Sequence, residues 1–468
     1  MSTPIYCVAD VRKIEQASAG AVPPLMERAG AAAADLAARI ASDESKDVLV
    51  LAGPGNNGGD ARVVADRLRE RFFRVVLAEK PEQIPADRRW GLVVDGLFGI
   101  GLARELSGEL ARMAEIASRQ SCAVLALDVP SGIDADTGRV LGSAVRATHT
   151  ITFIALKPGL LTLDGPDYAG QVSVADLGVD AARIAPPSGW LASPELFHEV
   201  LKTRPRNFHK GMAGSLGVLG GAAGMAGAAL LAGRAALKLG AGRVYVGLLA
   251  EGHPVLDAAA PELMLRDADD VLGQDLDALV AGPGIGTGER AETLVGAAIA
   301  SDLPLVLDAD ALNLVAESED LRKACARRTA ETLLTPHPAE AGRLLAESTA
   351  SVQADRLKAA RNLARHFNAH VVLKGNGSVL VARDGHWFIN GSGNAGMASA
   401  GMGDVLAGML GGLLAQRYSG ESTLVFGVHL HGAAADALAA RGDGPVGLSA
   451  SELLDPARRL WNEWLRRG

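Results

Sequence analysis

The sequence predicts an α/β fold in which two parallel, doubly wound sheets follow one another along the chain. Short, continuous apolar runs alternate with segments of helical periodicity, and such runs are typical of strands buried on both faces. Many of the 56 glycines directly follow an apolar run, where a parallel strand turns towards a helix. A proline-rich stretch at 180–206 interrupts the alternation. The 468 residues are therefore expected to form at least two domains.

The first half supplies the elements of one sheet. An alanine-rich helical segment covers residues 10–41 and is broken at Pro23-Pro24. The run DVLVLAGPG predicts a buried strand that ends in glycines, and a helix is expected over 58–71. Further strands are expected at 73–78, 91–95, 122–128 and 149–155. This alternation predicts a doubly wound sheet in an N-terminal domain of residues 1–185.

The second half repeats the α/β pattern and predicts a C-terminal domain of residues 195–468. Apolar runs predict strands at 214–220, 243–249, 277–281, 304–308, 370–375 and 378–383. The last two strands are joined by Asn376-Gly377, a pair typical of a tight hairpin turn.

Composition argues against several classes of partner. The net charge of −8 and the aromatic content of 4% argue against binding nucleic acid. Cys7, Cys122 and Cys325 are too few and too far apart for a disulfide framework or a zinc site. Residues 211–233 carry no charge, but their glycines favour a strand, a turn and a helix over a membrane span. The first residues lack the apolar stretch of a signal peptide, so a cytoplasmic protein without a membrane segment is expected.

A glycine-rich segment, GPGNNGGDA at 53–61, lies between the first predicted strand and its helix. Glycines there let the backbone approach a phosphate, and helix N-termini attract anions. Gly53, Gly55 and Gly58 also match the G-x-G-x-x-G dinucleotide pattern, and Glu79 lies where a ribose-binding acid is expected. Taken alone, this pattern would suggest a dehydrogenase.

Two further strand ends carry acidic side chains. Asp95 ends the strand before the loop GLFGIGLARE, and Asp128 ends the next strand, followed by Ser131. A single aspartate at such a junction is often only a helix or turn cap. Three polar, glycine-rich loops at one sheet edge favour a ligand site. The oxygen ligands suit a monovalent or alkaline-earth cation beside a phosphate.

The motifs GPGNNGGD, VVDGLFGIGL, LDVPSGIDADTG and TFIALKPGL, in this order, resemble the NAD(P)H-hydrate epimerase family. The resemblance implies a Rossmann-like domain in which Asn57, Asp95 and Ser131 help to hold a potassium ion. It makes Asp128 the acid or base at the reacting nicotinamide, with Lys157 as the alternative. The family usually has glycine where Ala61 stands. The remaining implied substrate-binding residues are Asn56, Asn57, Gly58, Gly59, Asp60, Gly99, Ile100, Gly101, Leu102, Ala103, Arg104 and Glu105.

In the second half, GSGNAGMASAGMGDVLAG places Asp404 at the start of a strongly apolar helix. Backbone amides at that position can hold a transferring phosphate, and Asp404 can deprotonate an attacking hydroxyl. The alternative is a simple helix cap. Lys374 lies at a strand end before the tight turn, and His337 lies between two prolines, where ligand contact is favoured over a core position.

The motifs HKGMAGSLGVLGG, MAGA, AGPGIG, LDADALN, TPHPAEAGRLL, LKG and AGMGDVLAG resemble the ADP/ATP-dependent NAD(P)H-hydrate dehydratase family, which has a ribokinase-like fold. The resemblance implies a hydrate site lined by Ala226, Gly286, His337 and Asp404, with Asp404 as the base. It also implies ADP with Mg²⁺ as the phosphoryl donor, giving AMP and phosphate. The implied nucleotide-binding residues are Lys374, Gly375, Asn376, Gly377, Ser378 and Gly403.

Together the two resemblances imply one repair enzyme for hydrated NADH and NADPH. The first half would interconvert the R and S hydrates (NADHX and NADPHX), and the second would dehydrate the S form. Both families commonly assemble, so a homo-oligomer is expected. Three alternatives remain: a dehydrogenase in the first half, a small-molecule kinase of ribokinase-like fold fused to a nucleotide-binding module, and a nucleotide-sensing or protein-binding module.

Overall fold

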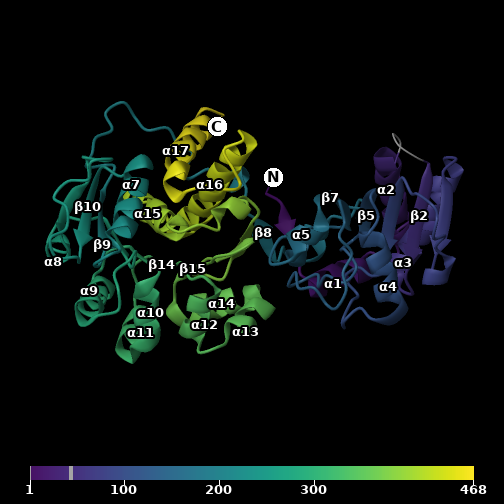
Figure 1. Cartoon of the computed structure of the whole chain (residues 1–468), viewed down its shortest axis with the longest axis horizontal. Helices are drawn as coiled ribbons and strands as arrows, with labels where there is room; N and C mark the ends of the chain where they lie inside the picture. Colours follow the sequence, from purple (N-terminus) through teal and green to yellow (C-terminus); the bar gives the residue numbers. More distant parts are fainter. Residues whose placement is uncertain (1, 42–45, 468) are drawn as a thin grey trace. The chain divides into compact units, whose positions relative to one another are not determined.

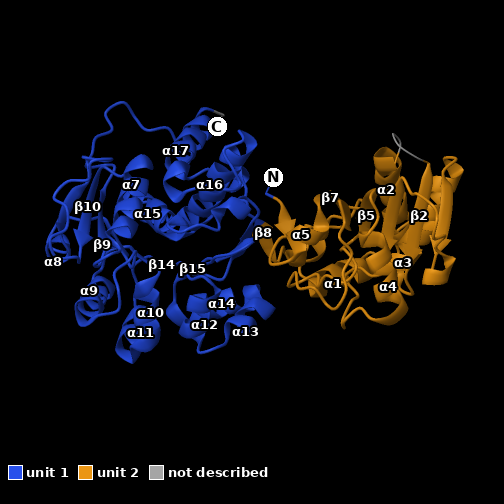
Figure 2. Cartoon of the chain, in the orientation of Figure 1, with its two compact units in different colours: residues 1–2, 191–468 blue, residues 3–190 orange. Residues whose placement is uncertain are grey.

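The computed structural model describes residues 2–41 and 46–467, and the chain folds as two compact units. One unit comprises residues 3–190, and the other comprises residues 191–468 together with residues 1–2 (Figure 2). The division falls within the proline-rich stretch that the sequence marks as a boundary region.

The N-terminal unit is built on a parallel sheet with the strand order β3-β2-β4-β5-β6-β7. Each of the predicted strands is present. The last strand, β7, was not predicted, because its exposed polar residues hide the apolar pattern. The strands are β2 (Asp47–Ala52), β3 (Arg74–Ala78), β4 (Leu92–Gly96), β5 (Ala123–Leu127), β6 (His149–Phe153) and β7 (Gln171–Ala175).

Helices cover both faces of this sheet, as the sequence predicts (Figure 1). Val48 and Val50 of β2 pack in one apolar cluster with the helices α1, α2 and α3. Leu49 and Leu51, on the other face of the same strand, pack with α4. The helices are α1 (Val8–Ala17), α2 (Leu25–Ala41), α3 (Asn56–Glu70) and α4 (Gly108–Ser118), with the short α5 (Gly165–Ala169) and α6 (Ala181–Ile184). Two short strands, β1 (Pro4–Ile5) and β8 (Gly189–Leu191), pair antiparallel.

The sheet grows in opposite directions from β2, because β3 is added on one side of it and β4 and the later strands are added on the other. The switch point therefore lies between β2 and β4. Ligands of doubly wound sheets bind at the carboxyl edge of such a switch point. Helix α3 begins at Asn56, two residues before the predicted start. Glycines 58 and 59 hide this start because glycine has a low helix propensity.

The C-terminal unit contains strands in the order β17-β16-β15-β14-β13-β12-β9-β10-β11. They run parallel from β15 to β11, and β15, β16 and β17 pair antiparallel. The hairpin predicted at Asn376-Gly377 joins β15 to β16. The short or charged strands β11, β14 and β17 were missed. The strands are β9 (Ser215–Gly220), β10 (Arg243–Leu248), β11 (Met264–Asp267), β12 (Ala278–Ala281), β13 (Leu305–Leu307), β14 (Thr332–Leu334), β15 (His370–Leu373), β16 (Ser378–Val381) and β17 (Trp387–Asn390).

Two helical layers enclose this sheet (Figure 1). One layer contains α7 (Ala226–Lys238), α15 (Met402–Ala415), α16 (Gly420–Ala440) and α17 (Leu454–Arg467). The other contains α9 (Glu289–Ala300), α10 (Asp310–Glu317), α11 (Glu319–Ala326), α12 (Pro338–Leu345), α13 (Thr349–Ala354) and α14 (Arg356–Phe367), and the short α8 (Ala268–Val271) packs on β9 and β10. The segment 211–233 forms β9 and the start of α7. Among the described residues, α16 alone has the length and hydropathy of a membrane span, and 67% of that window is buried inside the protein.

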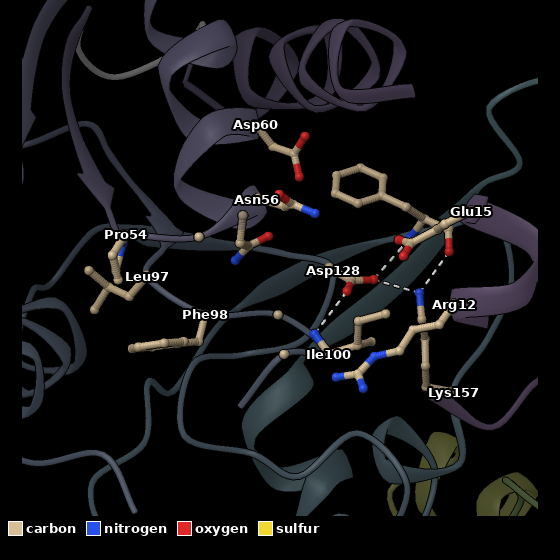
Figure 3. A pocket seen from close by; sticks show the side chains of 15 residues that line it. Arg12, Glu15, Pro54, Asn56, Asp60, Leu97, Phe98, Ile100, Asp128 and Lys157 are labelled. Atoms are coloured by element: carbon tan, nitrogen blue, oxygen red, sulfur yellow. Dashed lines mark hydrogen bonds and ion pairs between the residues drawn. The ribbon is translucent and has the colours of Figure 1, made fainter. Parts of the chain in front are cut away.

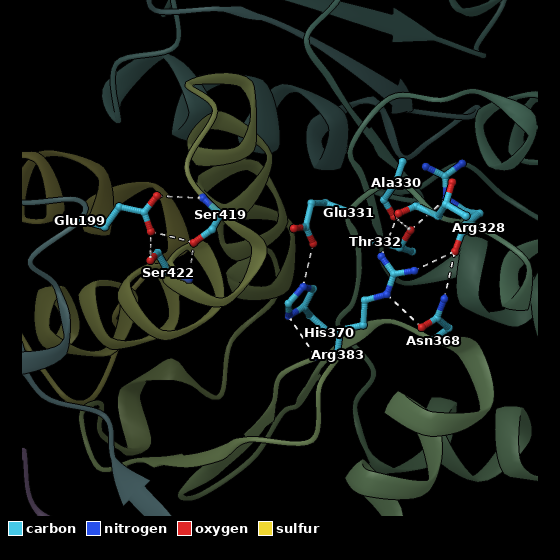
Figure 4. Close-up of polar contacts among 11 residues, drawn as sticks. Glu199, Arg328, Ala330, Glu331, Thr332, Asn368, His370, Arg383, Ser419 and Ser422 are labelled. Atoms are coloured by element: carbon cyan, nitrogen blue, oxygen red, sulfur yellow. Dashed lines mark hydrogen bonds and ion pairs between the residues drawn. The ribbon is translucent and has the colours of Figure 1, made fainter.

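Polar side chains fix several element ends within this unit (Figure 4). The buried guanidinium of Arg328 donates to backbone carbonyls of Ala298, Ile299, Ser301 and Leu303, at and just after the end of α9. It therefore supplies donors to carbonyls in the last turn of α9 and in the loop that follows it. The carboxylate of Glu199 accepts from the amide and hydroxyl of Ser419, which caps α16.

Helix α15 is almost wholly buried and packs tightly against α7. A Cβ built on Gly408 would lie 2.0 Å from the carbonyl oxygen of Ala232, and one on Gly412 would lie 2.9 Å from the Cα of Ala236. The glycines of this apolar helix therefore serve close helix packing inside the unit.

Gly408→Ala is expected to destabilise the C-terminal unit by about 1–3 kcal/mol, because backbone atoms of α7 must move to admit the methyl group. The control is Gly227→Ala in the first turn of α7, where a Cβ has nothing within 4 Å. Alanine favours a helix, so this control is expected to be neutral or stabilising by up to about 1 kcal/mol. Urea unfolding of both variants measures the difference. Equal stability of Gly408→Ala and the wild type would contradict the packing argument.

Candidate active sites

A cavity of about 380 Å³ opens at the switch point of the N-terminal sheet (Figure 3). Its walls come from α1, the start of α3, the loop after β4 and the ends of β5 and β6. The fold thus brings together polar groups from segments far apart in sequence. The predicted residues that line this cavity are Asn56, Asn57, Asp60, Gly99, Ile100, Gly101 and Asp128.

A buried ion pair lies in the wall of this cavity. The Nζ atom of Lys157 lies 2.5 Å from Oδ1 of Asp128, and it also donates to the carbonyl of Phe153 (2.7 Å) and to Oγ1 of Thr152 (2.9 Å). Lys157 is fully buried, and these three acceptors match the three protons of its ammonium group. The amide of Ile100 donates to Oδ2 of Asp128. Asp128 has a φ of +65°, a left-handed conformation that is uncommon for a residue other than glycine.

Two more carboxyl groups face the same cavity. Burial raises the pKa of Asp60 to about 8, and the charges of Asp128 and Glu15 add to the shift. Burial and the charge of Asp128 also raise the pKa of Glu15. At neutral pH, Asp60 therefore holds its proton in the wall that also carries the Asp128–Lys157 pair.

Of the residues predicted to hold a cation, Asn57 lines the cavity, whereas Asp95 and Ser131 are not among its lining residues. Asp95 is fully buried, and it accepts from both the amide (2.9 Å) and the hydroxyl (2.7 Å) of Ser131. The Ser131 hydroxyl also contacts the carbonyl of Phe98, at 3.0 Å. Asn57 lines the cavity itself, and its buried Nδ2 has no hydrogen-bond partner among the described residues. Burial raises the pKa of Asp95 to about 6, against the lowering effect of the Ser131 hydrogen bonds.

Some predicted substrate-binding residues do not line this cavity. A Cβ on Gly58 would lie 1.8 Å from the carbonyl oxygen of Gly53, so this glycine serves close packing of α3 against the strand end. Glu79 forms an exposed ion pair with Arg62, with a distance of 2.7 Å. The other predicted residues outside the cavity wall are Gly59, Leu102, Ala103, Arg104 and Glu105.

Sequence reasoning missed Arg12 and Glu15, which α1 brings into the cavity. Their spacing of three residues places them on one helix face. An exposed face of a surface helix has the same pattern, so only the packing of α1 on the sheet distinguishes the two.

A second polar site lies at the carboxyl edge of the C-terminal sheet. The Nζ atom of Lys374, after β15, lies 2.8 Å from Oδ1 of Asp308, after β13. Thr335 donates to the same oxygen at 2.7 Å, and Glu340 lies 3.9 Å from Lys374. Although burial lowers the pKa of Lys374, the charges of Asp308 and Glu340 raise it more. Lys374 therefore stays protonated at neutral pH.

Asp404 faces this lysine from the first turn of α15. Burial and the charge of Asp308 raise the pKa of Asp404 to about 6, against the lowering effect of Lys374. A Cβ on Gly403 would lie 3.4 Å from Nζ of Lys374 and 3.6 Å from Oδ2 of Asp308. Gly403 therefore keeps space between the helix start and the ion pair. Gly401 caps the helix with a φ of +88°.

His337 has a structural role that the sequence did not predict. Its Nδ1 accepts from the amides of Ala339 and Glu340 and so caps α12. The carboxylate of Glu340 in turn accepts from the amide of His337. Its Nε2 lies 3.2 Å from Glu340. The ring is half-exposed, and burial together with the charge of Lys374 lowers its pKa. His337 is thus held as a neutral ring near Lys374.

The predicted loops around Ala226 and Gly286 meet each other. The amide of Ala222, just before α7, donates to the carbonyl of Gly284 at 2.7 Å. The amide of Gly286, which has a φ of +76°, donates to Asp310 at 2.9 Å. In the turn after Lys374, the hydroxyl of Ser378 contacts the carbonyl of Gly375.

Helix α16 anchors the glycine-rich segment that leads into α15. Asp436 accepts from the amide of Gly393 (2.8 Å) and from the side-chain amide of Asn394 (3.0 Å). One turn earlier, a Cβ on Gly432 would lie 2.5 Å from the carbonyl oxygen of Ser392, whose hydroxyl contacts the carbonyl of His429. The route of the segment before Gly403 and Asp404 is therefore set by α16.

Asp436→Ala is expected to speed amide hydrogen exchange in residues 392–403 at least several-fold, because two donors lose their acceptor. Mass spectrometry of peptides from this segment measures the change. Asp443→Ala, at an exposed aspartate beyond the end of α16, is the matched control. Unchanged exchange in Asp436→Ala would show that other contacts hold the segment.

Two family models match the chain. The model for NAD(P)H-hydrate dehydratase matches residues 216–457, and the model for the YjeF-related protein N-terminus matches residues 23–92 and 79–159. A bifunctional NAD(P)H-hydrate repair enzyme of Escherichia coli is 37% identical over 98% of this chain and 94% of its own length. A protein of the same description from Coxiella burnetii is 37% identical over 94% of each chain.

A solved structure matches the C-terminal half. The ADP/ATP-dependent NAD(P)H-hydrate dehydratase of Bacillus subtilis, co-crystallised with ATP and Mg²⁺, aligns with a TM-score of 0.52 and 30% identity. The alignment covers 58% of this chain and 98% of that protein.

Proposed function

The chain belongs to the family of bifunctional NAD(P)H-hydrate repair enzymes, and we propose that its two units divide the repair between them. Residues 1–185 form the epimerase domain, which interconverts the R and S forms of NADHX and NADPHX. Residues 195–468 form the dehydratase domain, which converts the S form to NADH or NADPH and splits ADP into AMP and phosphate. The observation that carries this proposal is the match to such an enzyme over 98% of the chain, which includes both units.

In the epimerase domain, we assign the reacting ring to the cavity that contains Asp128. Lys157 holds the charge and orientation of Asp128 through the 2.5 Å contact. Asp128 is then the group that accepts or donates a proton while a bond at C6 of the hydrated ring breaks and re-forms. The amides at the start of α3, at Asn56 and Asn57, suit the diphosphate because a helix N-terminus attracts anions.

We propose potassium for this domain, held near Asp95, Ser131 and Asn57. The donor set fits, because Asp95, Ser131 and the carbonyl of Phe98 place three hard oxygens together. When bound, the ion supplies positive charge for the substrate phosphate. Turning the side-chain amide of Asn57 would present its oxygen instead of the unpartnered nitrogen.

In the dehydratase domain, Asp404 takes the proton from the C6 hydroxyl as that oxygen attacks the terminal phosphate of ADP. The amides at the start of α15 and the ammonium of Lys374 stabilise the charge on the transferring phosphoryl group. Phosphate then leaves C6, the ring nitrogen supplies its electron pair, and loss of a proton from C5 restores the reduced ring. A phosphate leaves far more easily than a hydroxide, which is why the nucleotide is consumed.

Magnesium accompanies the nucleotide in this proposal, and the charges of the site fit a divalent cation. The negative charges of Asp308, Glu340 and Asp404 act on the ammonium of Lys374, and Asp310 adds a further negative charge beside Asp404. Carboxylate oxygens are the ligands that Mg²⁺ prefers, and the ion neutralises phosphate charge when bound. The proposed hydrate-binding residues are Ala226, Gly286, His337 and Asp404, and the proposed nucleotide-binding residues are Lys374, Gly375, Asn376, Gly377, Ser378 and Gly403.

We also propose a cytoplasmic homo-oligomer whose partners are small molecules. The net charge of −8 and the buried position of α16 support small-molecule partners and a cytoplasmic location, whereas the homo-oligomer rests on the family resemblance.

The test of the whole proposal uses a mixture of R and S NADHX with the purified chain and Mg²⁺. Absorbance at 340 nm is followed with ADP, with ATP and with neither. A nucleotide-dependent rise that continues past the S fraction, faster than spontaneous epimerisation, supports both activities. A stable phosphorylated product without a rise would favour a small-molecule kinase instead.

Asp404→Asn is expected to reduce the dehydratase rate by at least 10²-fold, because the amide cannot accept the hydroxyl proton. Nucleotide binding is expected to change little. In the wild type, the rate should fall below about pH 6, where Asp404 becomes protonated. Assays of S-NADHX across pH 5 to 8 measure both effects, and near wild-type turnover would contradict the assignment.

The same variant has a predicted effect on stability. The raised pKa means that ionised Asp404 destabilises the folded chain, and this loss develops as pH rises from about 4 to about 6. Asp404→Asn is therefore expected to be more stable than the wild type at pH 7, by about 1–3 kcal/mol. The difference should vanish below about pH 4, as thermal unfolding across pH can show.

Asp128→Asn is expected to remove epimerisation while leaving dehydration of purified S-NADHX intact. It also leaves the buried ammonium of Lys157 without its counter-ion, which costs about 3–5 kcal/mol in the N-terminal unit. The retained dehydratase activity is the internal control for a folded C-terminal unit. Equal loss of both activities would contradict the separation of the two sites.

A further inference from the structure

The epimerase cavity holds one carboxyl group whose surroundings differ from those of Asp128. In the part of the chain that the structure describes, the carboxyl of Asp60 has no ion-pair or hydrogen-bond partner, although only 9% of the residue is exposed. Asp128, by contrast, contacts Lys157 and the amide of Ile100. Figure 3 shows Asp60 reaching towards the cavity from α3, well separated from Lys157.

Asp60 also borders a second cavity, of about 230 Å³, next to the first. The two cavities share Glu15, Asn56, Asp60 and Phe153. The remaining lining of the second cavity is apolar, with Ala19, Leu25, Met26, Ala29, Ile154 and Leu177. This apolar wall keeps Asp60 poorly solvated, and a poorly solvated carboxyl without a counter-ion retains its proton.

We propose that Asp60 is a second catalytic residue of the epimerase, the proton donor opposite the acceptor Asp128. The proposal rests on the epimerase function assigned above and gives this carboxyl a chemical step besides contact with substrate. The two carboxyl groups of the cavity differ in their contacts, since Asp128 is paired with Lys157 and Asp60 has no cation beside it among the described residues, and this arrangement suits a base and an acid.

The step balances without any further reactant. For the hydrate whose hydroxyl faces Asp60, the carboxyl proton passes to that hydroxyl, the C6–O bond breaks and water leaves. The electron pair of the ring nitrogen forms a double bond to C6. Water then adds to the other face of C6 and gives a proton to the Asp128 carboxylate. Transfer of that proton through solvent back to Asp60 restores the enzyme.

The charged groups around Asp60 determine its proton affinity. Glu15 and Arg12 face the cavity from α1, Asp128 follows β5, and Lys157 follows β6. The negative charges of Glu15 and Asp128 both favour the protonated form of Asp60. Removing the charge of Glu15 should therefore make Asp60 lose its proton at lower pH, a change that a purely structural residue would not produce.

The experiment uses the full chain without nucleotide, so that the dehydratase does not act. Epimerisation is followed by chromatography between pH 6 and 9.5, once from purified S-NADHX and once from purified R-NADHX. In the direction that starts from the hydroxyl facing Asp60, the wild-type rate is expected to fall above about pH 8, where Asp60 is ionised. Asp60→Asn is expected to lower kcat by at least 10²-fold, to change KM by less than about three-fold, and to lose the alkaline decline. Asp66→Asn, at an exposed aspartate of the same helix, is the matched control and should behave as the wild type.

A raised KM with unchanged kcat in Asp60→Asn, or an unchanged alkaline decline, would overturn the proposal. Glu15→Gln is the second variant, and it should move the alkaline decline to lower pH, whereas an unmoved decline would count against the role of Asp60. In water enriched in ¹⁸O, the epimerised product should carry the label at C6, and retention of the original oxygen would exclude the step. If the wild type itself does not interconvert the epimers, the proposed function fails; if it does and Asp60→Asn does equally well, only this inference fails.

Discussion

Each unit depends on a lysine–aspartate pair at the carboxyl edge of its sheet. Lys157 contacts Asp128 at 2.5 Å in one unit, and Lys374 contacts Asp308 at 2.8 Å in the other. Burying a charge without a partner costs free energy. Each lysine therefore holds its aspartate in one position, and each aspartate holds its lysine. The glycine loops around each pair can then approach a phosphate while the paired charges stay fixed. The two sites differ in topology and chemistry but share this constraint.

Beside each pair lies a carboxyl group without a dedicated cation. Burial raises the pKa of Asp60 in the first unit and of Asp404 in the second, and neighbouring carboxylates add to both shifts, while at Asp404 the charge of Lys374 opposes them. Such groups destabilise the folded chain when ionised, and they exchange protons near neutral pH. An aspartate with only a structural role would be paired with a cation in such a position, and it would then not exchange protons near neutral pH. The sites therefore combine one fixed charge with one group that titrates.

Backbone packing places these groups as much as charge does. In the C-terminal unit, Gly408 lets α15 lie against α7, and Gly403 leaves room for Lys374 at the helix start. Asp436 then holds the segment that enters the helix. In the N-terminal unit, Gly58 brings α3 against the strand end, so that Asn56 and Asn57 open towards the cavity. Larger side chains at Gly58 or Gly408 would clash with backbone and move the sites without touching a reacting atom.

Local apolar patterns and turn chemistry predict both sheets, most of their strands, the hairpin at Asn376-Gly377 and the glycine loops at the strand ends. Short motifs also marked Asp128, Lys157, Lys374 and Asp404 as candidate site residues. Strand β7 and the short strands β11, β14 and β17 were not predicted, because their apolar patterns are too brief or too polar. Packing in three dimensions brings Arg12 and Glu15 of α1 into the cavity of the N-terminal unit, makes His337 the cap of α12 and pairs Asp308 with Lys374. These contacts join segments separated by tens of residues or depend on a local cap geometry, and local sequence carries no record of which buried charges will meet.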